Sequence, residues 1–170
     1  MATATSTDLT RRALLLAWWG AALAAPTAVA AGKSIPVEVW KDPDCGCCKD
    51  WVAHMEANGF QVKVHDTGNN GVRAQLRIDR KYGSCHTAVV GGYALEGHVP
   101  ASEVLRLLNE KPQALGLAVP GMPVGSPGMD GAVYGGRRDA FDVLLLARDG
   151  TAKVYRHYAG NKPARKDVRL

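Results

Sequence analysis

The chain contains no apolar run long enough to form an ordinary membrane-spanning helix, which needs about 20 residues. The run that comes nearest, residues 13–25, ends at Pro26. Internal repeats are also missing, and the only low-complexity tract is one glycine-rich loop. The 4 cysteines are not spread along the 170 residues as in a disulfide framework, where each bridge closes a loop. These absences leave a single globular domain as the expectation, and a hydrophobic content of 46% suffices for its core.

The first 30 residues have the organisation of an export signal. Arg11 and Arg12 precede the apolar run, and Ala28-Val29-Ala30 provides the small-x-small pattern of a signal-peptidase site. We therefore predict that residues 1–30 are a secretory signal peptide and that the protein is periplasmic. The arginine pair also fits a twin-arginine signal, and an uncleaved N-terminal anchor is the competing interpretation. After cleavage, no stable membrane insertion is expected.

Charge is moderate and unevenly placed. The formal net charge is +5, and much of the excess lies between Arg156 and Arg169. Aromatic residues, which stack on bases in single-stranded nucleic-acid sites, are not interleaved with these basic residues beyond Tyr155 and Tyr158. We interpret residues 159–170 as a solvated basic tail and expect no nucleic-acid partner.

Hydrophobic periodicity predicts an α/β domain over residues 35–158. Alternation indicates strands at 35–40 and 60–64, a hairpin at 87–96 across Gly91-Gly92, and two more strands at 141–147 and 151–158. Helical spacing indicates helices at 45–58, 72–82 and 100–109, the first with Asp44 as its N-cap. The order β-α-β-α-β-β-α implies a sheet with helices on both sides, and the last two strands form an added C-terminal β-hairpin.

Three cysteines lie within the four residues Cys45-Gly46-Cys47-Cys48. Cys45 and Cys48 form a CxxC pair after the first strand, which is the thioredoxin-like arrangement. Unpaired backbone N–H groups at a helix start favour the thiolate, which is both a nucleophile and a soft-metal ligand. Cys47 suits wrapping of a thiophilic ion, or is a small apolar residue on the helix. Two structural disulfides are the remaining alternative, although the adjacent Cys47 and Cys48 make that awkward.

Cys85 and His86 precede the predicted third strand, where a thioredoxin-like fold holds a cis proline facing the CxxC pair. A thiol and an imidazole would then face Cys45 and Cys48, which favours ligand or proton-acceptor roles over a structural histidine. His98 lies close to a strand end and could reach the same site.

Two methionines, Met122 and Met129, lie in a loop rich in glycine and proline. Thioether sulfur is a neutral, soft ligand suited to Cu(I). The alternative is that both side chains fill gaps in a loop folded over the core.

Four blocks in the same order resemble the CopG-type periplasmic proteins, a family considered metal-binding: DCGCCKDW (44–51), SCHTAVV (84–90), EGHVP (96–100) and GLAVPGMPVGSPGM (116–129). The resemblance spans about residues 35–158. It implies a thioredoxin-like fold, a role in copper resistance and a cysteine-bridged copper cluster with cuprous/cupric redox chemistry. By motif, the implied thiolate ligands are Cys45, Cys48 and Cys85, and the candidates around them are His86, His98, Met122 and Met129. Cys47 belongs to the motif, with no role assigned by it.

The prediction is thus a periplasmic, copper-binding protein for copper resistance, holding Cu(I) at a multinuclear cysteine site. Its partners would be copper ions and other periplasmic copper-resistance proteins or a redox partner. Enzymatic activity, if present, would be redox of the bound copper or of the Cys45–Cys48 pair. A metal-free thiol–disulfide oxidoreductase and a structural zinc protein are the alternatives.

Overall fold

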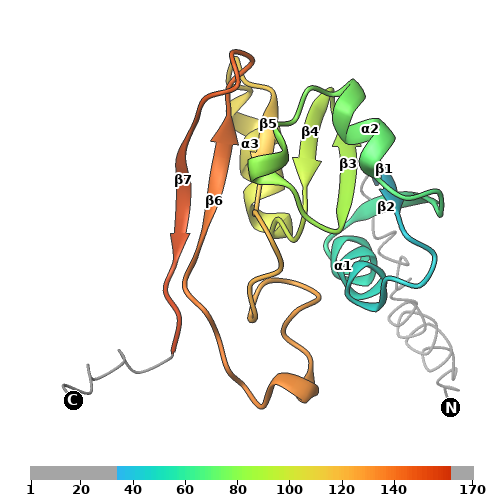
Figure 1. Ribbon diagram of the computed structural model, residues 1–170, viewed down its shortest axis with the longest axis vertical. Helices are drawn as coiled ribbons and strands as arrows, with labels where there is room; N and C mark the ends of the chain where they lie inside the picture. The colour runs from blue at the N-terminus through green and yellow to red at the C-terminus, as the bar shows by residue number, and fades with distance from the viewer. Residues whose placement is uncertain (1–33, 162–170) are drawn as a thin grey trace, which may run out of the picture. The chain divides into compact units, whose positions relative to one another are not determined.

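A mixed seven-stranded sheet with three α-helices forms the described part of the chain, residues 34–161 of a computed structural model (Figure 1). The strands are β1 (Ile35–Lys41), β2 (Phe60–His65), β3 (His86–Val90), β4 (Tyr93–Glu96), β5 (Gly116–Ala118), β6 (Phe141–Leu146) and β7 (Ala152–Tyr158). The helices are α1 (Gly46–Ala57), α2 (Asn70–Gln75) and α3 (Ala101–Glu110), with 3₁₀ helices at Arg80–Tyr82 and Ala132–Tyr134. The predicted signal peptide, residues 1–30, and most of the basic tail lie outside the described residues.

The strands lie in the order β2-β1-β3-β4-β5-β6-β7. β1 pairs with β2 in parallel, which the crossover helix α1 makes possible, and with β3 antiparallel. β3 and β4 form the predicted hairpin, and β4 pairs with β5 in parallel. β6 runs antiparallel to both β5 and β7. The predicted α/β class is confirmed.

Each face of the sheet packs against helical segments. The larger core joins β1 and β3 to α1 and α3 through Val37, Val39, Trp51, Met55, Val90, Val104 and Leu107, among others. The smaller core joins Ala94, Ala118 and Leu146 to Ile78, which follows α2. Successive strand residues point to opposite faces, so Leu95 and Leu117 belong to the first core and their neighbours Ala94 and Ala118 to the second.

Helix α1 presents its first turn at the carboxyl end of β1. Its N-cap is Cys45, so the prediction that Asp44 caps it was wrong; the Cys45 amide instead bonds the Asp42 carbonyl in a turn, at 3.1 Å. Trp51 is fully buried, and its indole Nε1 donates to the Val99 carbonyl at 2.9 Å. The helix is therefore held against the segment that leads into α3.

One predicted helix differs in the structure, and one strand of the structure was not predicted. The helix expected at 72–82 is split because Arg77 has a φ of +59°, which a helix does not allow, leaving the short α2 and a 3₁₀ turn. Strand β5 was not predicted; it lies between the helix predicted at 100–109 and the strand predicted at 141–147, and it pairs with both β4 and β6. Within residues 34–161, no helix has the length and apolar character needed to cross a bilayer.

Candidate metal centre

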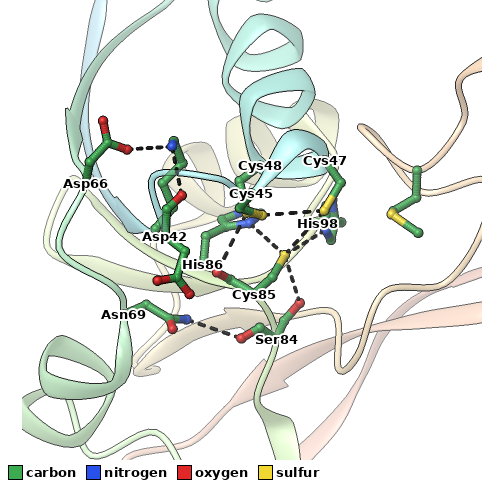
Figure 2. The surroundings of a disulfide bond; sticks show 12 residues. Asp42, Cys45, Cys47, Cys48, Asp66, Asn69, Ser84, Cys85, His86 and His98 are labelled. Atoms are coloured by element: carbon green, nitrogen blue, oxygen red, sulfur yellow. Dashed lines mark hydrogen bonds and ion pairs between the residues drawn. A yellow bond between two sulfur atoms is a disulfide. The ribbon is translucent and has the colours of Figure 1, made fainter.

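A disulfide joins Cys45 to Cys48 at the start of α1, with the two Cα atoms 5.3 Å apart (Figure 2). Cys48 is fully buried, whereas Cys45 is half-buried. The CxxC pair predicted as thiolates is thus oxidised here. These two sulfurs could serve as thiolate ligands only after the disulfide has taken up two electrons.

Cys47 and Cys85 are the two free thiols. The Cys47 Sγ lies 3.6 Å from the Cys45 Sγ and 3.9 Å from the Cys85 Sγ. Cys47 is half-buried rather than fully buried, and its sulfur lies beside two other sulfurs. It lies between the disulfide and Cys85, where all four sulfurs come within 4.8 Å of one another.

Two buried imidazoles adjoin the Cys85 sulfur (Figure 2). The His98 Nε2 lies 3.1 Å from it, and the His86 Nδ1 lies 3.5 Å from it. The His98 Nδ1 donates to the Pro127 carbonyl at 2.8 Å, which leaves the Nε2 lone pair facing the sulfur. The His86 Nε2 is buried without a hydrogen-bond partner among the described residues. A carbonyl that orients a histidine through its other nitrogen is the usual support of a metal ligand.

Burial decides the protonation of this cluster. It raises the pKa of the Cys85 thiol to about 12, with the neighbouring Cys47 adding to the effect. Burial also lowers the pKa of His98, and burial, with the neighbouring His98 as a smaller cause, lowers the pKa of His86 well below its usual range. At neutral pH the metal-free site therefore holds a protonated Cys85 thiol beside two neutral imidazoles. A metal ion that binds here displaces the thiol proton.

The loop of residues 121–129 packs against the first turn of α1. A Cβ atom on Gly128, whose φ is +83°, would lie 2.5 Å from the Cys47 carbonyl oxygen and 2.8 Å from the Trp51 amide nitrogen. Met129 is buried and its Sδ accepts from the Tyr134 hydroxyl at 3.4 Å, while Met122 is 52% exposed. The two methionines are thus in different surroundings, and within residues 34–161 no cysteine thiol donates a hydrogen bond to either sulfur.

Sequence reasoning assigned no role to Glu96 and Arg73, whose side chains both bind Ser84, the residue before Cys85. Glu96 is fully buried on β4, and its Oε1 accepts from the Arg73 Nε at 2.8 Å. Burial raises the pKa of Glu96, and its hydrogen bonds and the Arg73 charge oppose this. A glutamate closing the apolar run Tyr93-Ala94-Leu95 was the signal that could have identified it.

His54 is not part of the cluster. Its side chain is half-buried, and its Nε2 accepts from the Ala101 amide at 3.1 Å. Burial lowers the pKa of His54. It links α1 to the start of α3 by satisfying one of the unpaired amides there.

The arrangement unites four sulfurs and two imidazoles: Cys45, Cys47, Cys48 and Cys85 form one set with metal-ligand spacing, and Cys85, His86 and His98 form a second that shares Cys85. Thiolate and imidazole are ligands of thiophilic ions such as Cu(I) and Zn²⁺. The fold and the site together define a small mixed α/β protein with a candidate soft-metal and thiol-redox centre.

Comparison with known proteins supports this assignment. A family described as "Protein of unknown function, DUF411" matches residues 82–129. The solved structure named "Copper resistance protein copG- Form 1" is 47% identical, with a TM-score of 0.69, and the match covers 75% of this chain and 99% of that one. Form 2 is 46% identical with a TM-score of 0.68, covering 74% and 98%. The chain belongs to the CopG family of copper resistance proteins. No curated protein matches it.

Proposed function

We propose that the protein binds Cu(I) through the cysteine cluster and serves copper resistance. The observation that carries this proposal is the convergence of four sulfurs and two neutral imidazoles around Cys85. The name of the two similar solved structures, copper resistance protein, supports copper as the ion. Thiolate selects soft ions, and Cu(I) is the softest of those available to such a site.

The disulfide divides the site into two states. With Cys45 bonded to Cys48, the free donors are Cys47, Cys85, His86 and His98. Reduction by an external dithiol transfers two electrons and two protons and adds two thiols to the set. The reduced state offers enough sulfur for a bridged, multinuclear Cu(I) site, and cuprous/cupric redox at this centre is part of the proposal.

Fold and location complete the proposal. We assign a thioredoxin-like core to β1, α1, β2, β3, β4 and α3, supported by the CxxC at the start of α1, with β6 and β7 as the added C-terminal hairpin. Export to the periplasm is supported by the residue pattern of 1–30. Copper ions are the proposed partners, along with other periplasmic copper-resistance proteins or a redox partner. Met122 and Met129 remain candidate outer ligands.

The disulfide itself favours a second candidate function, metal-free thiol–disulfide exchange. A CxxC pair with one partly exposed and one buried sulfur at a helix start is the arrangement that such exchange requires. In that case Cys45→Ser would abolish reduction of a disulfide substrate such as insulin, and copper binding would be weak.

Anaerobic titration of the reduced protein with Cu(I), against a competing chromophoric chelator, tests the proposal. We expect tight binding of more than one Cu(I), lost in Cys45→Ser and in Cys85→Ser because each removes a shared sulfur. His157→Gln, at an exposed histidine paired with Asp142, is the control and should bind as the unmodified protein does. Weak binding, or binding that Cys85→Ser does not change, would refute the proposal of a shared Cu(I) cluster and would favour thiol–disulfide exchange.

A further inference from the structure

Glu96 and Arg73 form a buried ion pair next to the cysteine cluster. The pair makes no hydrogen bond to a cysteine sulfur. Glu96 is fully buried, Arg73 is 13% exposed, and their side chains meet at 2.8 Å between α2 and β4. A buried ion pair is poor evidence for stability, because the cost of desolvating both charges offsets their attraction. What the pair holds in place is therefore more informative than its own energy.

Both members of the pair bind the backbone of Ser84. The Ser84 amide donates to the Glu96 Oε1 at 2.7 Å. The Ser84 carbonyl accepts from the Arg73 guanidinium and from the Asn69 side-chain amide. Both backbone polar groups of the residue before Cys85 are thus bound by side chains from α2, its N-cap and β4.

The residue after His86 is held by the same carboxylate. The Thr87 hydroxyl donates to the Glu96 Oε2 at 2.6 Å and accepts from the Asn69 side chain at 3.2 Å. Glu96 thus binds the residue before and the residue after Cys85-His86. The Ser84 hydroxyl also donates to the Gly121 carbonyl.

These side-chain hydrogen bonds fix a segment that has no strand-to-strand backbone pairing of its own. Residues 83–85 belong to no helix or strand, and β3 begins only at His86. Without regular backbone pairing, the position of Cys85 depends on Ser84, and Ser84 is bound by Glu96 and Arg73. A metal ligand must be held to within a fraction of an ångström, so the groups that orient it matter as much as the ligand.

We propose that Glu96 and Arg73 are positioning residues for the metal centre, fixing the Cys85 thiol against Cys47 and His98. The inference rests on the proposed copper function. Both residues bind Ser84, Glu96 also binds Thr87, and neither bonds to a cysteine or histidine of the cluster, so their role is to set its geometry.

Glu96→Ala and Arg73→Lys test this proposal. Lysine keeps the charge paired, so the protein folds, but its single ammonium cannot hold Glu96 and the Ser84 carbonyl in the bidentate fashion of a guanidinium. We expect Cu(I) affinity to fall about tenfold or more in both variants, the range seen when supporting groups of a metal site are removed. Glu96→Gln keeps an oxygen for the Ser84 amide and should retain most of the affinity.

A second readout needs no metal. In a Cys47→Ser background without reductant, Cys85 is the one free thiol, because Cys45 and Cys48 are bonded. Its alkylation rate by a maleimide should rise in Glu96→Ala and Arg73→Lys and stay near the starting value in Glu96→Gln. This rate tests the positioning even if the unmodified protein binds no Cu(I), an outcome that would refute the proposed function alone.

Glu103→Gln is the matched control for a merely structural effect. Glu103 is a buried carboxylate on α3, bonded to the Tyr158 hydroxyl at 2.9 Å and paired with Arg106. It should lower the melting temperature and leave both readouts unchanged. If Glu96→Ala and Arg73→Lys behave in the same way, losing stability while Cys85 reactivity and Cu(I) affinity persist, the positioning role is overturned.

Discussion

Cys85 is the residue on which the whole centre converges. It belongs to both candidate ligand sets, lies 3.1 Å from the His98 Nε2 and 3.9 Å from the Cys47 sulfur, and carries a pKa raised to about 12 by burial. Its neighbour His98 is neutral because burial lowers the histidine pKa. The metal-free site thus keeps its proton on sulfur, and a metal ion bound through Cys85 would have to displace that proton.

We predict that the apparent Cu(I) affinity rises with pH. Between pH 6 and 8 the Cys85 thiol is protonated in the metal-free protein, and Cu(I) replaces that proton. The affinity should therefore increase by about tenfold per pH unit for each proton released. A competition titration at several pH values measures the slope. An affinity that is independent of pH would contradict the assigned protonation.

At the scale of elements, the centre is assembled where the start of α1, the segment before β3 and the loop of residues 121–129 meet. The loop supplies the Pro127 carbonyl that orients His98, and Gly128 lets it approach the Cys47 carbonyl. Because Gly128 has a φ of +83° and its missing Cβ would overlap α1, only glycine permits this contact.

Gly128→Ala should both destabilise the protein and weaken Cu(I) binding. The left-handed backbone alone costs about 1–2 kcal/mol for a residue with a Cβ, and the overlap with Cys47 and Trp51 forces the loop away from His98. Urea unfolding and the chelator competition measure the two effects. Gly131→Ala is the control, since Gly131 has a φ of −63° and open space around it. Equal stability and equal Cu(I) affinity of the two variants would show that the contact of this loop with α1 does not support the site.

Sequence periodicity identified most of these elements, and its failures have physical causes. The alternation at residues 35–40 and the helical spacing at Cys48, Trp51 and Met55 predicted β1 and α1, because each buries one face. β5 spans three residues, too few to show alternation, and exists because β4 and β6 supply partners on both sides. The split after α2 depends on the backbone of Arg77, for which no residue pattern gave a signal.

At the scale of the whole molecule, the two apolar clusters of the described residues contain no cysteine or histidine of the candidate metal centre. Two clusters of buried residues fill both faces of the sheet, and Val39, Trp51, Met55, Leu95 and Leu117 are fully buried without involving the cysteines. Folding free energy comes chiefly from such apolar burial.

Removing metal should therefore leave the protein folded. We expect the circular dichroism spectrum and cooperative thermal unfolding to persist in the presence of a strong zinc and copper chelator. The structural zinc alternative makes the opposite prediction, because domains held by a metal unfold when it is removed. Loss of the folded signal on chelation would establish that alternative. Addition of Cu(I) to the reduced protein should raise the melting temperature, since a ligand that binds only the native state stabilises it.

From the sequence alone followed the donor types, the α/β class and the segments that carry the donors, because these depend on residue identity and local periodicity. Only the tertiary structure decided which sulfurs are bonded and which are free, that Cys47 faces Cys85, and that the His98 Nε2 points to sulfur. It also placed Glu96 and Arg73 behind Ser84. Apart from the Cys45–Cys48 bond, which joins residues three apart at the start of α1, each of these contacts joins residues on different segments of the chain, so packing determines them and local sequence does not.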